Sequence, residues 1–233
     1  MNFYKSILAV FVLFLVFGGL QVYAGPNDPK ERVIPVKIVM DQYFVRNFNR
    51  IWAKEMSALP RPPAITAEDF AKDIIGLLTS RHRRYGVSYR VVVIENILAK
   101  ERVYFEYEYM NLLKNLSCQN SQLMAGFTGA AFLSTSLGSG GPIEVVGSAE
   151  HQFGRLFVQL GSLGIIMKPS KDVENMLNTL EHEVFHLFRA SHKKEGVLTD
   201  EERRIFLQEG RAAIQRNRNN AFMCSEPAYA QNK

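Results

Sequence analysis

Residues 181–192 read EHEVFHLFRASH and hold three of the five histidines in the 233-residue chain. On a helix at about 100° per residue, His182 and His186 lie one turn apart on one face, with Glu183 at its rim. The apolar positions of this segment fall in a stripe on the far side: Val173, Leu177, Leu180, Val184 and Leu187. The pattern predicts a helix that packs one face into the core and offers two imidazoles on the other.

Glu183 stands between the two histidines in the order His-Glu-x-x-His. Two imidazole nitrogens one helical turn apart can both reach a zinc ion at about 2.0–2.1 Å. A carboxylate in this place can hold a zinc-bound water, whose pKa the ion lowers toward about 7. We therefore expect Zn²⁺ as the cofactor, with His182 and His186 as ligands and Glu183 as the general base of a hydrolase.

His192 is the candidate third ligand, because catalytic zinc sites usually have three protein ligands and one open position. A straight helix would carry it about 15 Å along the axis from His182, at about 1.5 Å per residue. The helix must therefore end near residues 188–190, and the chain must turn back, for the three histidines to share one ion.

The stretch HEVFHLFRASH resembles the signature of the metzincin metalloproteases, H-E-x-x-H-x-x-G-x-x-H followed by a methionine turn. The resemblance implies that His182, His186 and His192 bind zinc and that Glu183 is the general base. Met223, within NNAFMCSEP, is the candidate Met-turn residue. The resemblance also implies a two-lobed catalytic domain with a twisted mixed sheet above the zinc-binding active-site helix. An extended peptide would pair with an edge strand within residues 128–160.

Two positions depart from the family pattern. Arg189 replaces the signature glycine, and a residue other than glycine in a left-handed turn costs about 1 kcal/mol or more. Either Arg189 takes the turn at some strain or the bend falls elsewhere. Ser225 replaces a tyrosine that many members have two residues after the methionine, although Tyr229 is near in the sequence.

Three other interpretations stay open. A gluzincin-like peptidase would take a glutamate third ligand from the next helix, at Glu201, Glu202 or Glu209, although such charge runs are usually solvated. A non-catalytic secreted protein stabilised by zinc would have no need of Glu183. A basic surface protein that binds acidic polymers would need a stronger charge than the net +5 of this chain.

The N-terminus predicts export. Residues 1–24 have one charge, Lys5, then a short apolar run and small residues up to Ala24, which is typical of a cleaved signal peptide; an uncleaved anchor is the alternative. The remainder, residues 25–233, is expected to form one zinc metallopeptidase domain that is secreted or periplasmic. In an oxidising compartment Cys118 and Cys224 are expected to form a disulfide, with two buried thiols as the alternative.

The order of the remaining elements favours an α+β fold or a mixed sheet covered by helices. Strands are expected at 32–40, 88–97 and 102–110, the last two as a possible hairpin, and within 125–136 and 155–161. Helices are expected at 47–59, from Thr66 toward Gly86, and throughout the segment after Ser170. The glycine-rich residues 137–147 lack the ending of a phosphate-binding loop and are interpreted as a surface loop.

Composition is that of an ordinary globular protein, with 47% apolar and 22% charged residues. No segment after the signal is long and apolar enough for stable membrane insertion. The basic run at 81–84 is interpreted as a polar helix end, so no nucleic-acid partner is expected. The expected partner is a peptide or protein substrate, and the chain is expected to be a monomer.

Overall fold

A computed structural model describes residues 31–56, 65–100, 103–133, 147–160, 169–191, 199–219 and 222–225. The predicted signal segment and most of the glycine-rich stretch lie outside these ranges. Within them, every helix is too short or too polar to serve as a membrane span.

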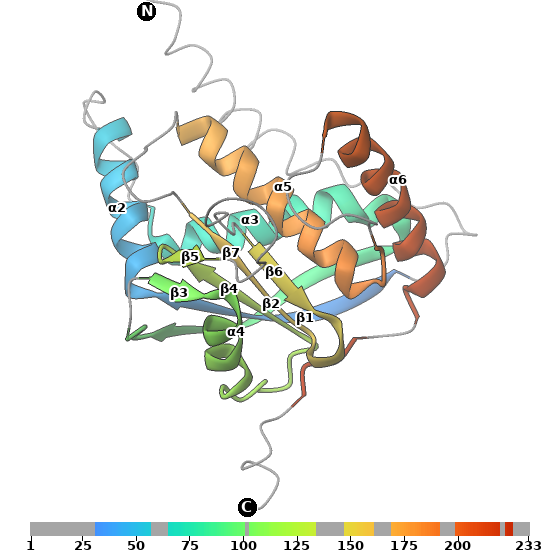
Figure 1. Ribbon diagram of the computed structural model, residues 1–233, viewed down its shortest axis with the longest axis horizontal. Helices are drawn as coiled ribbons and strands as arrows, with labels where there is room; N and C mark the ends of the chain where they lie inside the picture. The colour runs from blue at the N-terminus through green and yellow to red at the C-terminus, as the bar shows by residue number, and fades with distance from the viewer. Residues whose placement is uncertain are drawn as a thin grey trace, which may run out of the picture. The chain divides into compact units, whose positions relative to one another are not determined.

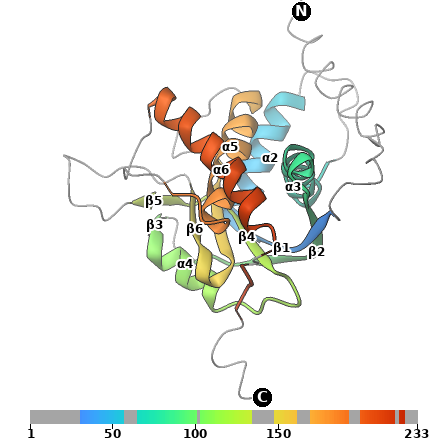
Figure 2. The ribbon, with the colours of Figure 1, turned by 90° about the vertical axis from the view of Figure 1, so that its right-hand side faces the viewer.

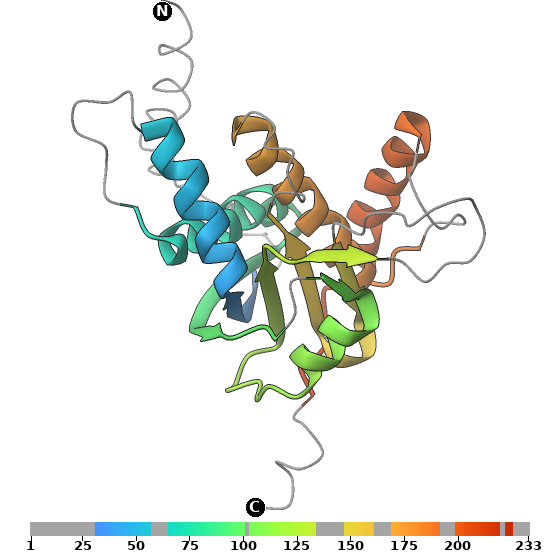
Figure 3. The ribbon, with the colours of Figure 1, turned by 60° about the vertical axis from the view of Figure 1, so that its left-hand side comes forward.

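A five-stranded mixed sheet forms the centre of the fold (Figure 1). Its spatial order is β2, β1, β4, β7, β6; neighbours among the first four are parallel, and β6 runs antiparallel to β7. The strands are β1 (Arg32–Asp41), β2 (Val87–Ile97), β4 (Leu123–Thr128), β6 (Gly147–Glu150) and β7 (Arg155–Gln159). A separate parallel pair, β3 (Val103–Phe105) and β5 (Ala131–Leu133), lies beside α4 (Figure 3).

Helices cover both faces of the sheet. They are α2 (Gln42–Met56), α3 (Ala67–His82), α4 (Glu106–Lys114), α5 (Pro169–Leu187) and α6 (Asp200–Asn217), with short 3-10 turns η1 (Arg83–Tyr85) and η2 (His151–Phe153). Four of the helices lie on one side, and α4 lies on the other (Figures 1 and 2). Strand β1 accordingly alternates between two cores: Ile38 packs toward the first face and Val39 toward the second. A parallel sheet buried on both faces needs such near-continuous apolar strands.

The arrangement is mixed α/β: the expected mixed sheet covered by helices is present, and strands and helices are not segregated along the chain as in an α+β fold. Helices α2 and α3 connect β1 to its parallel neighbour β2, because parallel strands need a long crossover connection. The predicted helix start at Thr66 is confirmed, since its side chain accepts from the Asp69 amide in a capping box. Gly86 ends η1 with a left-handed φ of 76°.

The predicted strand 102–110 is wrong beyond its first residues. Strand β3 stops at Phe105, helix α4 follows, and β3 pairs with β5 and not with β2 in a hairpin. The alternating aromatic residues of this segment are typical of a strand, but in the structure helix α4 begins at Glu106. The Glu108 carboxylate accepts from the Phe105 amide at 2.8 Å and so caps that turn.

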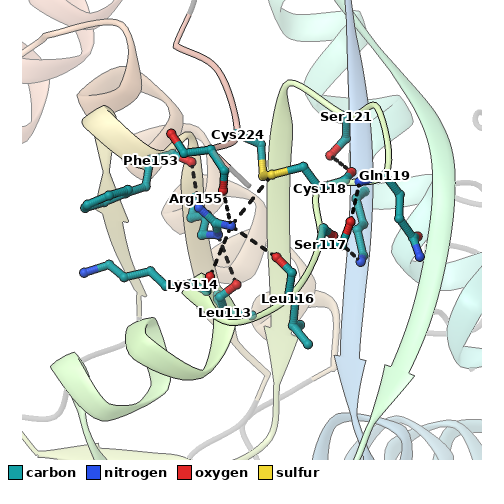
Figure 4. The surroundings of a disulfide bond; sticks show 12 residues. Leu113, Lys114, Leu116, Ser117, Cys118, Gln119, Ser121, Phe153, Arg155 and Cys224 are labelled. Carbon is teal, nitrogen blue, oxygen red and sulfur yellow. Dashed lines mark hydrogen bonds between the residues drawn. A yellow bond between two sulfur atoms is a disulfide. The ribbon is translucent and has the colours of Figure 1, made fainter. Parts of the chain in front are cut away.

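The predicted disulfide between Cys118 and Cys224 is present and joins the end of the described chain to the loop after α4 (Figure 4). Beside it lies the buried Arg155 of β7. Its guanidinium donates to the carbonyl oxygens of Leu113 at 3.0 Å and Ser225 at 2.7 Å, among others. A cation at the C-terminal end of α4 also complements the helix dipole. The C-terminal segment is thus held by a covalent bond and by charge-assisted hydrogen bonds.

Helices α5 and α6 approach closely at Gly210. A Cβ atom at this position would lie 2.2 Å from Cδ2 of the buried Phe185. We expect Gly210→Ala to lower the free energy of unfolding by about 2 kcal/mol, because overpacking forces Phe185 off its position. Gly76→Ala is the matched control, since Gly76 is an exposed glycine of α3 with nothing within 4 Å of its Cβ site. Urea unfolding should show that this second change stabilises by about 0.5–1 kcal/mol; equal effects would contradict the close approach.

Candidate metal centre

Helix α5 carries the candidate site. As predicted, Leu177, Leu180, Val184 and Leu187 are buried against the core. The side chains of His182 and His186 are half-buried on another face. The sequence places the histidines on an accessible side of a helix whose position is fixed by its apolar stripe.

The two imidazoles converge. Their Nε2 atoms are 3.1 Å apart. Two nitrogens that each bind a tetrahedral zinc at about 2.0–2.1 Å are about 3.3 Å apart. The separation in the structure therefore fits one shared ion with little rearrangement.

A backbone contact fixes the orientation of His186. Its Nδ1 lies 3.0 Å from the carbonyl oxygen of Ala190. A carbonyl only accepts, so Nδ1 carries the proton and Nε2 keeps the lone pair that a metal needs. A second hydrogen bond of this kind accompanies most metal-binding histidines.

Phe206 of α6 packs under both imidazoles, and the sequence analysis missed it. Its ring centroid lies 4.3 Å from that of His182 and 5.1 Å from that of His186. The side chain is 2% exposed. Phe206 limits the movement of both imidazole rings. A single phenylalanine in a helix with many charged residues gives no sequence signal that it contacts the candidate site.

Helix α5 ends in a tight left-handed turn. The Arg189 amide donates to the His186 carbonyl at 2.8 Å, and the Ala190 amide donates to the Phe185 carbonyl at 3.0 Å. These two bonds form a Schellman motif, whose C′ residue is left-handed. Arg189 holds that position with φ of 67°. Of the two alternatives that the sequence leaves open, the structure therefore shows the one in which Arg189 takes the turn itself.

His192 lies outside the described residues, so its role as third ligand stays a prediction. Among the described residues, no three histidine, cysteine, aspartate or glutamate side chains gather around a possible ion. The rival glutamates all have structural partners. Glu201 pairs with Arg204, Glu202 accepts from the Thr199 amide, and Glu209 pairs with Arg216. This arrangement disfavours the glutamate alternative.

Glu183 is buried between α5 and the edge strand β6. A Cβ on Gly147 would lie 3.1 Å from Glu183 Oε1 and 2.6 Å from Thr179 Cγ2, so the strand approaches this closely only because it has glycine there. No described residue donates a hydrogen bond to the carboxylate. Burial raises the pKa of Glu183 to about 8, and the nearby charge of Glu106 acts in the same direction.

Glu106, the first residue of α4, also contacts β6. It accepts a hydrogen bond from the Ser148 hydroxyl. The sequence did not predict a role for Glu106, because residues 102–110 have the alternating pattern of a strand. It also did not predict β6 as a strand, because residues 147–150 contain none of the β-branched or aromatic residues typical of strands. The carboxyl groups of Glu106 and Glu183 thus lie on the same end of β6, and the charge of Glu106 helps to keep Glu183 protonated.

Met223 lies in the segment that the disulfide holds. Its side chain is 62% exposed. The neighbouring Phe222 is buried and packs edge-to-face on Phe188, with ring centroids 5.1 Å apart. The segment thus reaches the end of the histidine helix, and the Met-turn role of Met223 stays a prediction.

His82 is not among the predicted site residues, and it is buried between α3 and α5. Its Nδ1 lies 2.8 Å from the Tyr89 hydroxyl, and its ring stacks on Phe185 at 5.5 Å. Glu181 lies 3.3 Å from its Nε2 and accepts from Arg81 at 2.6 Å. Burial lowers the pKa of His82 despite the adjacent Glu181. The cluster anchors α5 one residue before His182.

Comparison with solved structures finds a similar fold. The crystal structure of archaemetzincin from Methanopyrus kandleri matches with a TM-score of 0.54 and 15% sequence identity, over 82% of this chain and 99% of that chain. A scan against protein-family models and a search of curated proteins each find no match. The described chain therefore has a fold similar to that of archaemetzincin.

Proposed function

We propose that this protein is a zinc-dependent endopeptidase. The observation that carries the proposal is the 3.1 Å separation of the His182 and His186 Nε2 atoms on a helix that also presents Glu183. His182 and His186 would hold the ion, with His192 as the third ligand. When bound, zinc supplies an acidified water and a Lewis acid that polarises the scissile carbonyl.

Glu183 is proposed as the general base. Its carboxylate would accept a proton from the attacking water and later deliver it to the leaving amine. Burial raises the pKa of this carboxyl to about 8 in the absence of a cation. A divalent cation close by favours the charged form and lowers the pKa again. A general base works best when its pKa lies near the working pH, and these opposing effects bring the Glu183 carboxyl toward that range.

The edge strand β6 is the proposed binding place for the peptide. It lies against α5 and pairs with β7 on one side. An extended peptide could add to its other edge through main-chain hydrogen bonds, which places a scissile bond near Glu183. The strand lies within residues 128–160, where such an edge is expected. We further propose that the substrate binds in a cleft between an upper lobe, which contains the sheet, and a lower lobe, which follows His192.

We also propose that the chain is exported through residues 1–24 and acts as a secreted or periplasmic monomer. The Cys118–Cys224 disulfide supports this proposal, because such bonds persist mainly in oxidising compartments.

Metal content and cleavage together test the function. We expect the purified wild type to hold one zinc per chain and to cleave casein, and a chelator to abolish cleavage. His182→Ala, His186→Ala and His192→Ala should each lose the metal, whereas Glu183→Gln should keep it. A wild type without zinc would overturn the proposal. A wild type with tightly bound zinc and no cleavage of any protein or peptide would favour the non-catalytic zinc-stabilised alternative.

A further inference from the structure

Arg189, the left-handed residue that follows α5, forms a side-chain hydrogen bond with His151. Its Nε donates to Nε2 of His151 at 2.9 Å. His151 begins η2, directly after the last residue of the edge strand β6. A residue with a Cβ in this conformation is strained, so the contact ties a strained turn to the neighbouring strand.

His151 is suited to accept this bond. A guanidinium only donates, so Nε2 must carry the lone pair and the ring must be neutral. Burial lowers the pKa of His151, and the charge of Arg189 lowers it further. Glu150, which directly precedes His151, forms an ion pair with Lys114 of α4 at 2.8 Å.

We propose that Arg189 and His151 are a positioning pair, which holds the left-handed turn after α5 and, through the Ala190 carbonyl of that turn, the orientation of His186 as a zinc ligand. The inference rests on the proposed zinc site. Where a glycine would take the left-handed turn without strain, this chain keeps a strained residue and secures it through its side chain. The bond also joins the end of β6 to the exit of α5, so the strand proposed for the substrate and the helix with the metal ligands are held in one arrangement.

If Arg189 and His151 act as a pair, their variants should differ in zinc affinity in a specific pattern. The affinity can be measured by competition with a chromogenic chelator. His151→Ala and Arg189→Ala should each weaken zinc binding about tenfold, the lower range for groups that orient metal ligands. His151→Gln should recover most of the loss, because the amide oxygen can accept from the guanidinium. Arg189→Gly should bind more tightly than Arg189→Ala, because glycine needs no partner to adopt the turn.

A double variant distinguishes this positioning role from a general effect of His151 on packing: His151→Ala is introduced into the Arg189→Gly protein. There, adding His151→Ala should change zinc affinity by less than about twofold, since no bond remains to be lost. A full tenfold loss in that background, or unchanged affinity in both alanine variants, would overturn the inference while leaving zinc binding by the wild type intact. If the wild type itself bound no zinc, the proposed function would fail and the inference with it. Urea unfolding of the metal-free proteins should show the same coupling, and additive effects there would also contradict it.

Discussion

Replacing Glu183 with glutamine is expected to lower peptide hydrolysis by about a thousandfold while the protein keeps its zinc. General acid–base catalysis by a positioned side chain contributes about 10²–10⁴-fold. Glutamine has nearly the same shape, and Glu183 has no described hydrogen-bond donor that depends on its charge. The loss should therefore appear in the chemical step and not in the folding or metal content. Steady-state cleavage of a quenched fluorescent peptide and metal analysis of the same sample would measure both.

Glu174→Gln provides the control. Glu174 is on the same helix α5, and its side chain is exposed. The same chemical change there should leave kcat/KM within about twofold, as surface substitutions usually do. If Glu183→Gln retained full activity, the general-base assignment would be wrong even if the zinc site were right. If it lost activity and zinc together, the glutamate would be acting as a ligand or a structural support.

The central helix could be predicted from the sequence because its signals are local. The apolar residues Leu177, Leu180 and Val184 repeat at helical spacing, and that repeat alone fixes which side His182 and His186 occupy. A helix end near residues 188–190 could also be predicted, from the distance that a straight helix would put between His182 and a third histidine. Both predictions depend only on residues within twenty positions of each other.

The surroundings of the site could not be predicted because they come from distant segments. Phe206 reaches the imidazoles only through the packing of α6 on α5, and Gly147 approaches Glu183 only because β6 turns back on β7. Burial of Glu183 is a result of those contacts, so neither its raised pKa nor the influence of Glu106 could be read from sequence spacing. The choice between an α+β fold and a mixed sheet covered by helices could not be made from the sequence for a similar reason. It depends on the parallel pairing of β1 with β2, which the order of the elements does not show.

The metal-free protein is expected to become less stable relative to its Glu183→Gln variant as the pH rises. The pKa of this carboxyl is about 8 in the folded chain against 4.5 in the absence of the fold. Between these values the folded state binds a proton that the unfolded state has lost, so wild-type stability falls as the pH rises. Glutamine carries no charge at any pH. The variant should match the wild type below about pH 4.5, gain progressively above it, and exceed it by about 4 kcal/mol at pH 8.

Urea unfolding of chelator-treated protein at pH 5 and pH 8 measures this difference, with Glu174→Gln as an exposed control that should show almost none. A gap that did not widen between the two pH values would contradict the burial of a neutral Glu183. Repeating the experiment with saturating zinc then tests where the ion lies. A cation beside the carboxylate stabilises its charged form, so the pH-dependent gap should shrink to a small part of its metal-free size. A gap that zinc left unchanged would place the metal away from Glu183, because an ion close enough to share an active site with this carboxylate must shift its protonation.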